Sequence, residues 1–313
     1  MLTTENPQIQ KAIDAMISYR EVGMPKAIKR GLIIGLIISV VIDIIILWAE
    51  GFAEAWAIAL VVTIILLIVS GFAAHANFYS KLRRMYKRDI IPLLVKDVCD
   101  NAQFDELGGI ARDVIRRSRV FQWYNSTYLK QEDYVSGIVD KTAFEFCEAH
   151  LGHVEETRDK DGKVHRRNVV DFDGLVFCAD FNKDFSYHTI LHSSRTFTIL
   201  MRSIKMESVD FNKIFYTYCE DEQEARYILT PSLQERIVDL NRKLHTSLNT
   251  KNIQISFFSN RLVIFAPTSK DHFEPPQFKK ITIERVEKDY DCVKTLVDII
   301  NDLNLNTRIW TKK

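Results

Sequence analysis

The chain has 313 residues, of which 47% are hydrophobic and 27% are charged, and its formal net charge is only +1. A chain so close to neutral lacks the global positive field that draws proteins onto nucleic acid, so nucleic acid is excluded as a partner. Its five cysteines are odd in number and irregularly spaced, which excludes a disulfide scaffold or a zinc ribbon and predicts free thiols in a reducing compartment.

Residues 1–30 predict an amphipathic helix followed by a basic flank. Asn6 and Pro7 are typical of a helix start, and apolar residues follow at helical spacing as far as Tyr19. Gly23 and Pro25 are expected to end the helix. The sequence leaves open whether its apolar stripe lies on the bilayer or packs against the rest of the protein.

Residues 31–75 predict a hairpin of two transmembrane helices. The runs Gly31–Ala49 and Ala55–Ala74 are almost free of charge and approach the roughly 20 residues that cross a bilayer. A pair of buried helices in a soluble core is the alternative, but neither run has a polar face that could meet water. The connection at 50–54 is so short that the two helices must be antiparallel neighbours.

The charges around the hairpin predict that both termini are cytoplasmic, in a multi-pass protein of the cytoplasmic (inner) membrane. The connecting loop has two glutamates and no Lys or Arg, whereas the outer flanks of both runs are basic. Trp48 and Trp56 bracket the loop, where aromatic rings favour the membrane interface. The basic residues determine the topology and could also hold anionic lipid; they are Lys26, Lys29, Arg30, Lys81, Arg83, Arg84, Lys87 and Arg88.

Asp43 is the one carboxylate inside these apolar runs, at a cost of about 2.5–3.5 kcal/mol on insertion scales. In an antiparallel hairpin it lies at about the depth of Thr63, which could donate a hydrogen bond to it. The pair could specify the packing of the hairpin or of an oligomer, or form part of an ion path. A protonated or outward-reaching side chain without consequence is the simpler alternative.

Residues 76–130 predict a helical segment that leaves the membrane, with a break at Pro92 and a further helix at Ile110–Arg117. From residue 131 to 313 the pattern predicts a cytoplasmic α+β domain, mostly an antiparallel sheet with packing helices and a C-terminal helix. A barrel like that of pleckstrin-homology domains is one arrangement of these elements. The predicted strands are Tyr134–Val139, Ala143–His150, Val169–Asp180, Thr189–Leu200, Lys213–Cys219, and a hairpin of Ile253–Ser259 and Arg261–Ala266 around Asn260; the predicted helices are Glu222–Ile228, Pro231–Leu244 and Asp291–Leu303.

Several distinctive stretches resemble a bacterial membrane-protein family of unknown function, with two N-terminal spans and a soluble C-terminal domain. The most specific are Glu224–Pro231 (EARYILTP) and Leu303–Trp310 (LNLNTRIW), and others are Thr142–Phe146 and Gly174–Phe181. The resemblance implies a bacterial lineage and the same membrane topology. It implies no activity.

The familiar loops of nucleotide-binding proteins, zinc proteases and serine hydrolases do not occur in the sequence, so no catalytic residue and no cofactor is predicted. The pairs His188/His192 and His150/His153 invite a metal site. On a strand, however, residues four apart lie about 13 Å from each other, which is too far for one ion. Surface histidines are the simpler interpretation, and no metal is predicted.

Three further groups allow a functional or a structural reading. The acidic residues Asp171, Asp173, Asp180 and Asp184 could hold a carboxylate pair, but an exposed strand and turn explain them better. Arg226 and Arg308 lie in distinctive motifs, and structural roles are expected for both, with Glu222 as the partner of Arg226 one helical turn back. The aromatic residues Phe121, Trp123, Tyr124, Tyr128 and Tyr134 could line a peptide groove or pack helices onto the sheet.

The sequence therefore favours a membrane-anchored cytoplasmic binding or scaffold domain that recognises a protein or lipid at the inner membrane surface. The expected partners are the lipid bilayer and a protein at the cytoplasmic face, and homo-oligomerisation is left open. An enzyme acting on a membrane-associated substrate is the first alternative. An oligomeric channel or transport accessory that uses Asp43 is the second.

Overall fold

The computed structural model describes residues 6–50, 52–195 and 201–305. Its chain divides into two units, which are described separately. The first, the hairpin unit, comprises the residues up to Ile91 together with Phe273–Glu287, and the second, the sheet unit, comprises Pro92–His272 and the residues from Lys288 onward.

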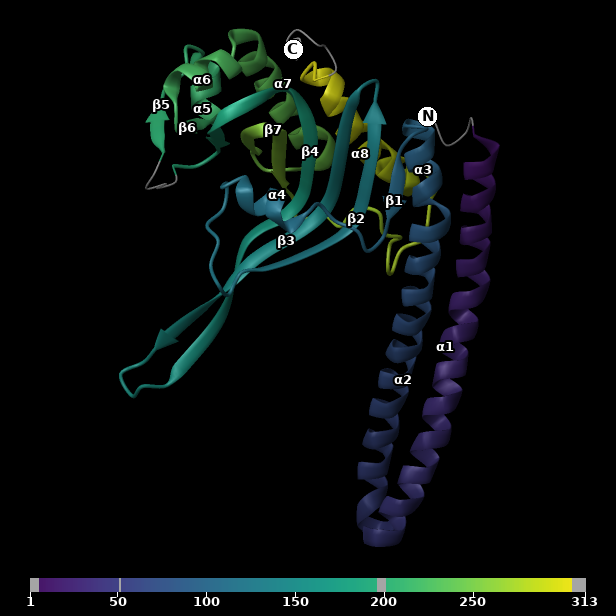
Figure 1. Ribbon diagram of the computed structural model, residues 1–313. Coiled ribbons are helices and arrows are strands. Elements are labelled where there is room, and N and C mark those ends of the chain that lie inside the picture. Colours follow the sequence, from purple (N-terminus) through teal and green to yellow (C-terminus); the bar gives the residue numbers. More distant parts are fainter. Residues whose placement is uncertain (1–5, 51, 196–200, 306–313) are drawn as a thin grey trace. The chain divides into compact units, whose positions relative to one another are not determined.

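Two long antiparallel helices, α1 (Pro7–Glu50) and α2 (Phe52–Asp89), lie side by side in the hairpin unit (Figure 1). Each contains a stretch that is long and apolar enough to cross a membrane. Only 11% of the most apolar window of α1 and 6% of that of α2 is buried, so these side chains are not the interior of a soluble core. Such an exposed apolar surface is the composition expected of lipid-facing helices.

The prediction that the first helix ends at Gly23 and Pro25 is wrong, because α1 runs through both residues. At Gly23 the two helices approach so closely that a Cβ atom would lie 2.6 Å from the ring of Phe78. Glycine therefore serves helix–helix contact here, and α1 continues through Pro25 although proline costs about 3 kcal/mol inside a helix. The apolar stripe that includes Ile9 and Ile13 is buried within this unit.

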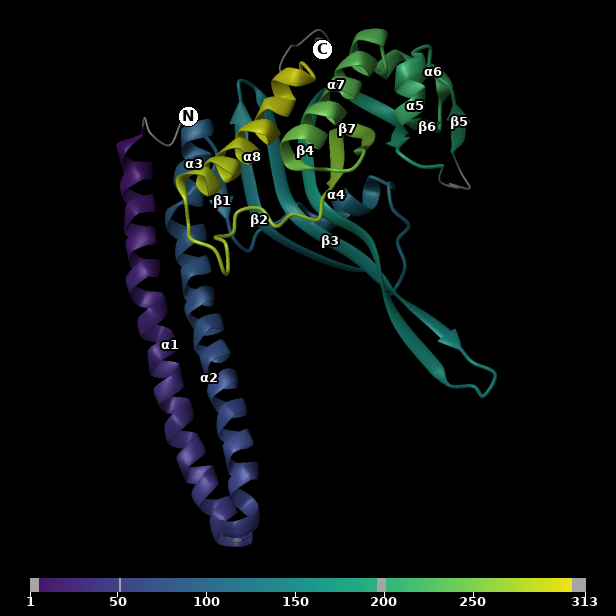
Figure 2. The ribbon, with the colours of Figure 1, turned by 180° about the vertical axis from the view of Figure 1, so that it is seen from behind.

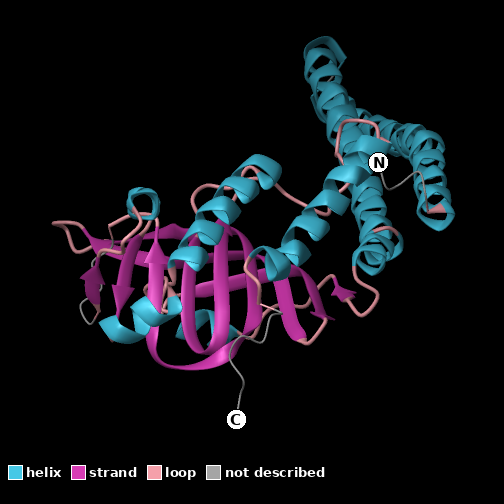
Figure 3. Cartoon of the chain, turned by 90° about the horizontal axis from the view of Figure 1, so that it is seen from above, coloured by secondary structure: helices cyan, strands magenta, loops and turns pink. Residues whose placement is uncertain are grey.

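An antiparallel sheet of seven strands forms the centre of the sheet unit, in the order β1-β2-β3-β4-β6-β5, with β7 also paired to β4. Helices α7 and α8 cover one face, and both lie in front of the strands in Figure 2. Figure 3 shows helices on both sides of the sheet, and the core on the second face includes residues at and beside α4. The strands are β1 (Gln103–Asp105), β2 (Tyr128–Val139), β3 (Thr142–Arg158), β4 (Val164–His192), β5 (Arg202–Ile204), β6 (Tyr216–Cys219) and β7 (Gln254–Pro267); the other helices are α3 (Ile91–Val98), α4 (Arg112–Arg117), α5 (Val209–Ile214), α6 (Glu222–Ile228), α7 (Pro231–Leu248) and α8 (Ile283–Asp302).

The predicted fold class, a mostly antiparallel α+β domain with a C-terminal helix attached to two apolar helices, is confirmed. No described strand pairs β1 with β5, so the sheet is open and the barrel arrangement is not realised. The start of α7 also agrees with the sequence, because Pro231 is its first residue and the Thr230 side chain accepts a hydrogen bond from the Leu233 backbone N–H.

Three strand predictions are wrong in detail. The segments Val169–Asp180 and Thr189–Leu200 were expected to be separate, but β4 is one strand whose register shifts between Asp180 and Thr189; residues 196–200 lie outside the described part. Asn260 is not a hairpin turn, because β7 is continuous and pairs with β4 on both sides of it. Ser259 has φ +54°, so the irregularity is a bulge that accompanies the shift in β4.

The third correction concerns Lys213–Cys219, which was predicted as one strand. Its first residues belong to the short helix α5, where the Ser208 hydroxyl accepts a hydrogen bond from the backbone N–H of Phe211, and only β6 is extended. This N-cap fixes a helical turn that the alternation of side chains alone does not reveal. Beyond the body of the sheet, β3 and β4 continue as a two-stranded arm (Figure 1).

Candidate functional site

A polar row crosses the face of the sheet that also carries α4. Gln103 of β1 pairs with Ser136 of β2, Ser136 pairs with Glu145 of β3, and Glu145 pairs with Cys178 of β4. Directly paired residues in adjacent strands point to the same face. Glu145 shares its face with Cys147, Ala149 and Leu151 along β3, and those residues are buried in the core beside α4. The polar row therefore borders that core face, and its last member, Cys178, is itself part of the buried core.

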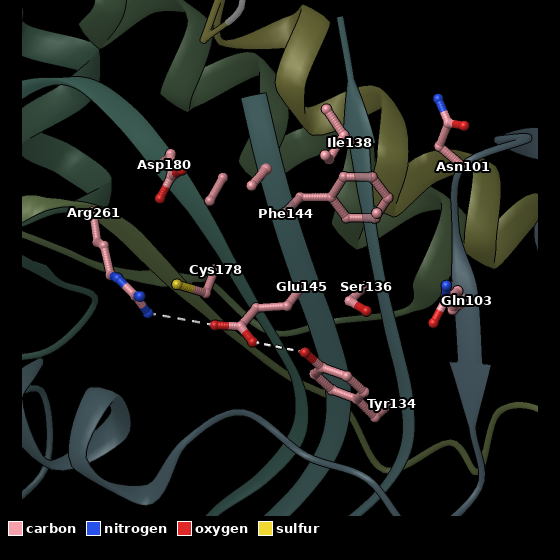
Figure 4. A pocket seen from close by; sticks show the side chains of 13 residues that line it. Asn101, Gln103, Tyr134, Ser136, Ile138, Phe144, Glu145, Cys178, Asp180 and Arg261 are labelled. Atoms are coloured by element: carbon pink, nitrogen blue, oxygen red, sulfur yellow. Dashed lines mark hydrogen bonds and ion pairs between the residues drawn. The ribbon is translucent and has the colours of Figure 1, made fainter. Parts of the chain in front are cut away.

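A pocket of about 470 Å³ opens over this row (Figure 4). Glu145 lies between two partners: its Oε2 accepts a hydrogen bond of 2.9 Å from the Tyr134 hydroxyl, and its Oε1 lies 3.5 Å from Nη1 of Arg261. The side chain of Glu145 is 23% exposed and that of Arg261 is 37% exposed. Both charges are thus held by the protein and remain accessible to a ligand.

The electrostatic setting keeps the phenol and the thiol of the pocket neutral. Burial, followed by the hydrogen bond to Glu145, raises the pKa of Tyr134. Burial, with a contribution from the negative charge of Glu145, raises the pKa of Cys178 to about 12. A thiol with this pKa is protonated at neutral pH, so Cys178 lacks the thiolate that nucleophilic chemistry requires.

The remaining lining makes the pocket a site for binding a polar group rather than an apolar one. Asn101 and Gln103 contribute amides, Asp180 contributes a second carboxylate on the strand pair that carries Arg261, and Ile138 at the rim is 50% exposed. Donors, acceptors and both signs of charge converge here with one apolar anchor. Such a lining suits a ligand that has donor and acceptor groups and a short apolar part.

Sequence reasoning named Tyr134 and Asp180 for other reasons and did not foresee the pocket. Of the aromatic residues it grouped together, Phe121, Trp123 and Tyr134 all pack against the core beside α4, which is the packing alternative that the sequence left open. The one usable signal was Glu145, a charged residue on the same strand face as buried apolar residues. Arg261, its partner, lies 116 residues further along the chain.

Two histidine–aspartate pairs form between residues that sequence reasoning considered separately, whereas His188 contacts Glu220 and His192 contacts Ser194. His150 Nδ1 lies 2.7 Å from Asp173, and His153 Nδ1 lies 2.8 Å from Asp171, across β3 and β4 at the base of the arm. Each histidine thereby engages one ring nitrogen with a carboxylate. Within the described residues no group of three or more His, Cys, Asp or Glu side chains is arranged to hold a metal ion.

In the hairpin of α1 and α2, the structure places Asp43 and Thr63 in contact. Thr63 Oγ1 donates a hydrogen bond to Asp43 Oδ2 at 2.5 Å. Trp48 is 89% exposed and Trp56 is 57% exposed on the two sides of the turn. The contact joins α1 to α2 within the apolar part, where a polar side chain is otherwise costly.

The basic residues of the hairpin do not share one environment. Lys26, Lys29, Arg30, Lys81, Arg84 and Arg88 are exposed, and Arg88 pairs with Asp89 at 2.7 Å. Arg83 and Lys87 instead form ion pairs with Glu274, and the Lys87 side chain is 0% exposed. These two side chains are occupied by the protein itself.

Glu274 belongs to Phe273–Glu287, a segment of the hairpin unit that sequence reasoning missed. Arg20 of α1 donates hydrogen bonds to the backbone carbonyls of Pro276 and Gln277, and the Tyr79 hydroxyl of α2 donates to that of Pro275 at 2.8 Å. Burial lowers the pKa of Arg20. The contacting residues are far apart in sequence, so no local pattern reveals them.

Of the two motif arginines, Arg226 is described and Arg308 lies outside the described residues. Arg226 binds Glu222, one turn back on α6, with its Nη2 at 2.9 Å, and also reaches Glu207 and the carbonyl of Lys205. This arrangement fastens α6 to the chain that precedes α5. Its side chain is committed to contacts within the protein.

Comparison with known proteins finds a partial match to a family but no activity. Residues 170–305 match the model of a family described as "Protein of unknown function (DUF3137)", which confirms the predicted resemblance over that part of the chain. None of the curated proteins matches the sequence. A mycobacterial crystal structure, that of trehalose monomycolate transport factor A, TtfA, is similar over 68% of this chain and 96% of that one, with 10% identity and a TM-score of 0.32. A likeness this weak carries no argument about function.

Proposed function

We propose that this protein is a membrane-anchored binding protein whose sheet unit recognises a protein partner at the cytoplasmic face of the inner membrane. The hairpin of α1 and α2 is the anchor, and both termini lie in the cytoplasm. The observation that supports the proposal is the combination of two exposed apolar helices with a folded unit that carries an open, polar pocket.

The pocket supports a protein partner in particular through its setting. It lies beside the core that includes residues of α4, and a half-exposed Ile138 lines it together with an accessible charge pair. Interfaces between proteins combine an apolar anchor with charged and hydrogen-bonding groups around it. Glu145 and Arg261 would then determine which partner binds, since each charge rejects a partner that leaves it unpaired.

Photocrosslinking in living cells tests this proposal. A photoreactive amino acid in place of Ile138 of the full-length protein should give a defined protein adduct, and the same substitution at Tyr187, which is 48% exposed but does not line the pocket, should not. The change Arg261→Ala should suppress the adduct while leaving the protein in the membrane. Identical adducts from both positions, or an adduct indifferent to Arg261→Ala, would contradict the proposal.

The proposed topology needs a separate measurement. Reporter enzymes that are active on only one side of the membrane can be fused before Pro7 and inserted in the turn near residue 51. We expect a cytoplasmic signal from the first and an external signal from the second, because the basic flanks stay inside. The opposite pattern would place the sheet unit outside and rule out a cytoplasmic partner.

A further inference from the structure

A groove of about 570 Å³ runs between α1 and α2 where the apolar part of the hairpin ends. The side away from the apolar runs is lined by three cations (Lys26, Arg30 and Lys81), the amide of Asn77 and the rings of Tyr19 and Phe78. The other side is lined by Ser70 and by small and apolar residues that include Gly31 and Ile34. The groove lies entirely within the hairpin unit. All three cations therefore lie toward one end of the groove, and the residues that line the other end carry no charge.

Close packing of the helices makes the groove shallow and continuous. At Gly31 an added Cβ atom would lie 2.4 Å from the Cβ of Ala74, so the helix backbones meet there without intervening side chains. Toward the start of α1, the rings of Tyr19 and Phe78 stack with their centroids 5.2 Å apart, and both line the groove. The larger side chains stand beside this line of contact and form the sides of the groove.

The charge of the groove is not balanced from within. Among the described residues that line it, three are cations and none is acidic. Lys26 and Arg30 are four residues apart on α1, so they project from one face of that helix, and Lys81 faces the groove from α2. Arg83 and Lys87 differ from these three cations, because both form ion pairs with Glu274.

We propose that this groove is a binding site for an anionic phospholipid. The phosphate and the charged headgroup lie among Lys26, Arg30 and Lys81, and an acyl chain follows the apolar end past Ile34. The cations lie where the apolar stretch ends, and the apolar part of the lining lies within that stretch. A lipid has the same order, because its charged headgroup lies at the membrane surface and its hydrocarbon chains lie inside. The inference rests on the membrane placement in the proposed function but not on the sheet pocket.

The test compares two variants with the same net charge. Lys26→Gln/Arg30→Gln/Lys81→Gln removes the cations of the groove, and Lys29→Gln/Arg84→Gln/Arg88→Gln removes three exposed cations that do not line it. Full-length proteins in nanodiscs of zwitterionic phosphatidylcholine are titrated with phosphatidylglycerol, and bound lipid is counted by native mass spectrometry. Each groove cation is expected to contribute about fivefold to affinity, so the first variant should lose roughly a hundredfold and the second less than about fivefold.

The outcomes separate this inference from the proposed function. Equal losses in the two variants, or no preference of the unmodified protein for phosphatidylglycerol, would overturn the lipid site while the anchor stands. Soluble glycerol phosphate should not compete, because it lacks the acyl chains, and competition would replace the lipid site with one for a free phosphate. Failure of the unmodified protein to insert into membranes would instead refute the proposed function.

Discussion

The ion pairs of Glu274 give a quantitative test of how the segment 273–287 is held in the hairpin unit. Its Oε1 lies 3.7 Å from Nζ of Lys87, whose side chain is 0% exposed, and it also pairs with Arg83, whose side chain is 35% exposed. Removing one partner of a buried ion pair costs about 3–5 kcal/mol, because the other charge stays buried without compensation. For Glu274→Gln we expect a loss at the lower end of this range, about 3 kcal/mol, because Arg83 can turn to water and Lys87 keeps its other contacts.

A matched control is available in the same unit. Glu21 and Lys280 form an ion pair at 3.1 Å, but their side chains are 53% and 82% exposed. Exposed pairs contribute about 0–1 kcal/mol, so Glu21→Gln should have little effect although it removes the same charge. In the double variant Glu274→Gln/Lys87→Met part of the lost stability should return, because the buried ammonium is removed together with its carboxylate partner.

Hydrogen exchange of the full-length protein in detergent, followed by mass spectrometry on peptides that cover 273–287, measures this local stability. A loss of about 3 kcal/mol corresponds to roughly 150-fold faster exchange when opening is rapid and reversible. The reasoning is refuted if Glu274→Gln accelerates exchange no more than Glu21→Gln does. It is also refuted if the double variant exchanges as fast as Glu274→Gln alone.

Three further predictions concern single positions. Gly35→Ala should lower the thermal stability of the hairpin in detergent and Gly71→Ala should not, because an added Cβ atom lies 2.2 Å from Ser70 Oγ in the first case and 3.4 Å from its nearest neighbour in the second. Thr63→Val should destabilise the hairpin by about 0.6–1.7 kcal/mol in a steric-trapping measurement. In the background of Asp43→Leu the same change should have almost no effect, because the hydrogen bond is already absent. Because burial raises the pKa of the Cys178 thiol to about 12, this thiol should resist iodoacetamide in the native protein at pH 8 and react in denaturant. The same shift should lower the free energy of unfolding as the pH rises above about 9, because only the unfolded chain then loses the proton.

Features carried by consecutive residues could be read from the sequence. The apolar runs identify α1 and α2, and Thr230 with Pro231 identifies the start of α7, because membrane crossing and helix capping depend on neighbours within one or two turns. The hydrogen bond between Asp43 and Thr63 could be anticipated for a similar reason, since a short turn fixes the depth of both residues.

The candidate site could not be read in the same way, because it depends on register. Gln103, Ser136, Glu145 and Cys178 form a row only when the pairing of four strands is known, and a shift by one residue would turn a strand's side chains to the other face. The incorrect turn at Asn260 has a related cause. The polar residues around Asn260 suggested that the strand ends there. They lie instead where β7 pairs with the part of β4 in which the register shifts.

The basic residues around the membrane helices show how the structure changes the meaning of a sequence rule. Lys81, Arg83 and Lys87 lie within two turns of α2, and a count of positive charges treats them alike. The structure commits Arg83 and Lys87 to Glu274 and leaves Lys81 in the groove with Lys26 and Arg30. A cation neutralised by a carboxylate of its own chain attracts anionic lipid far less than an uncompensated one. Lipid selectivity should therefore follow the groove cations, whereas the position of the segment 273–287 should follow Arg83 and Lys87.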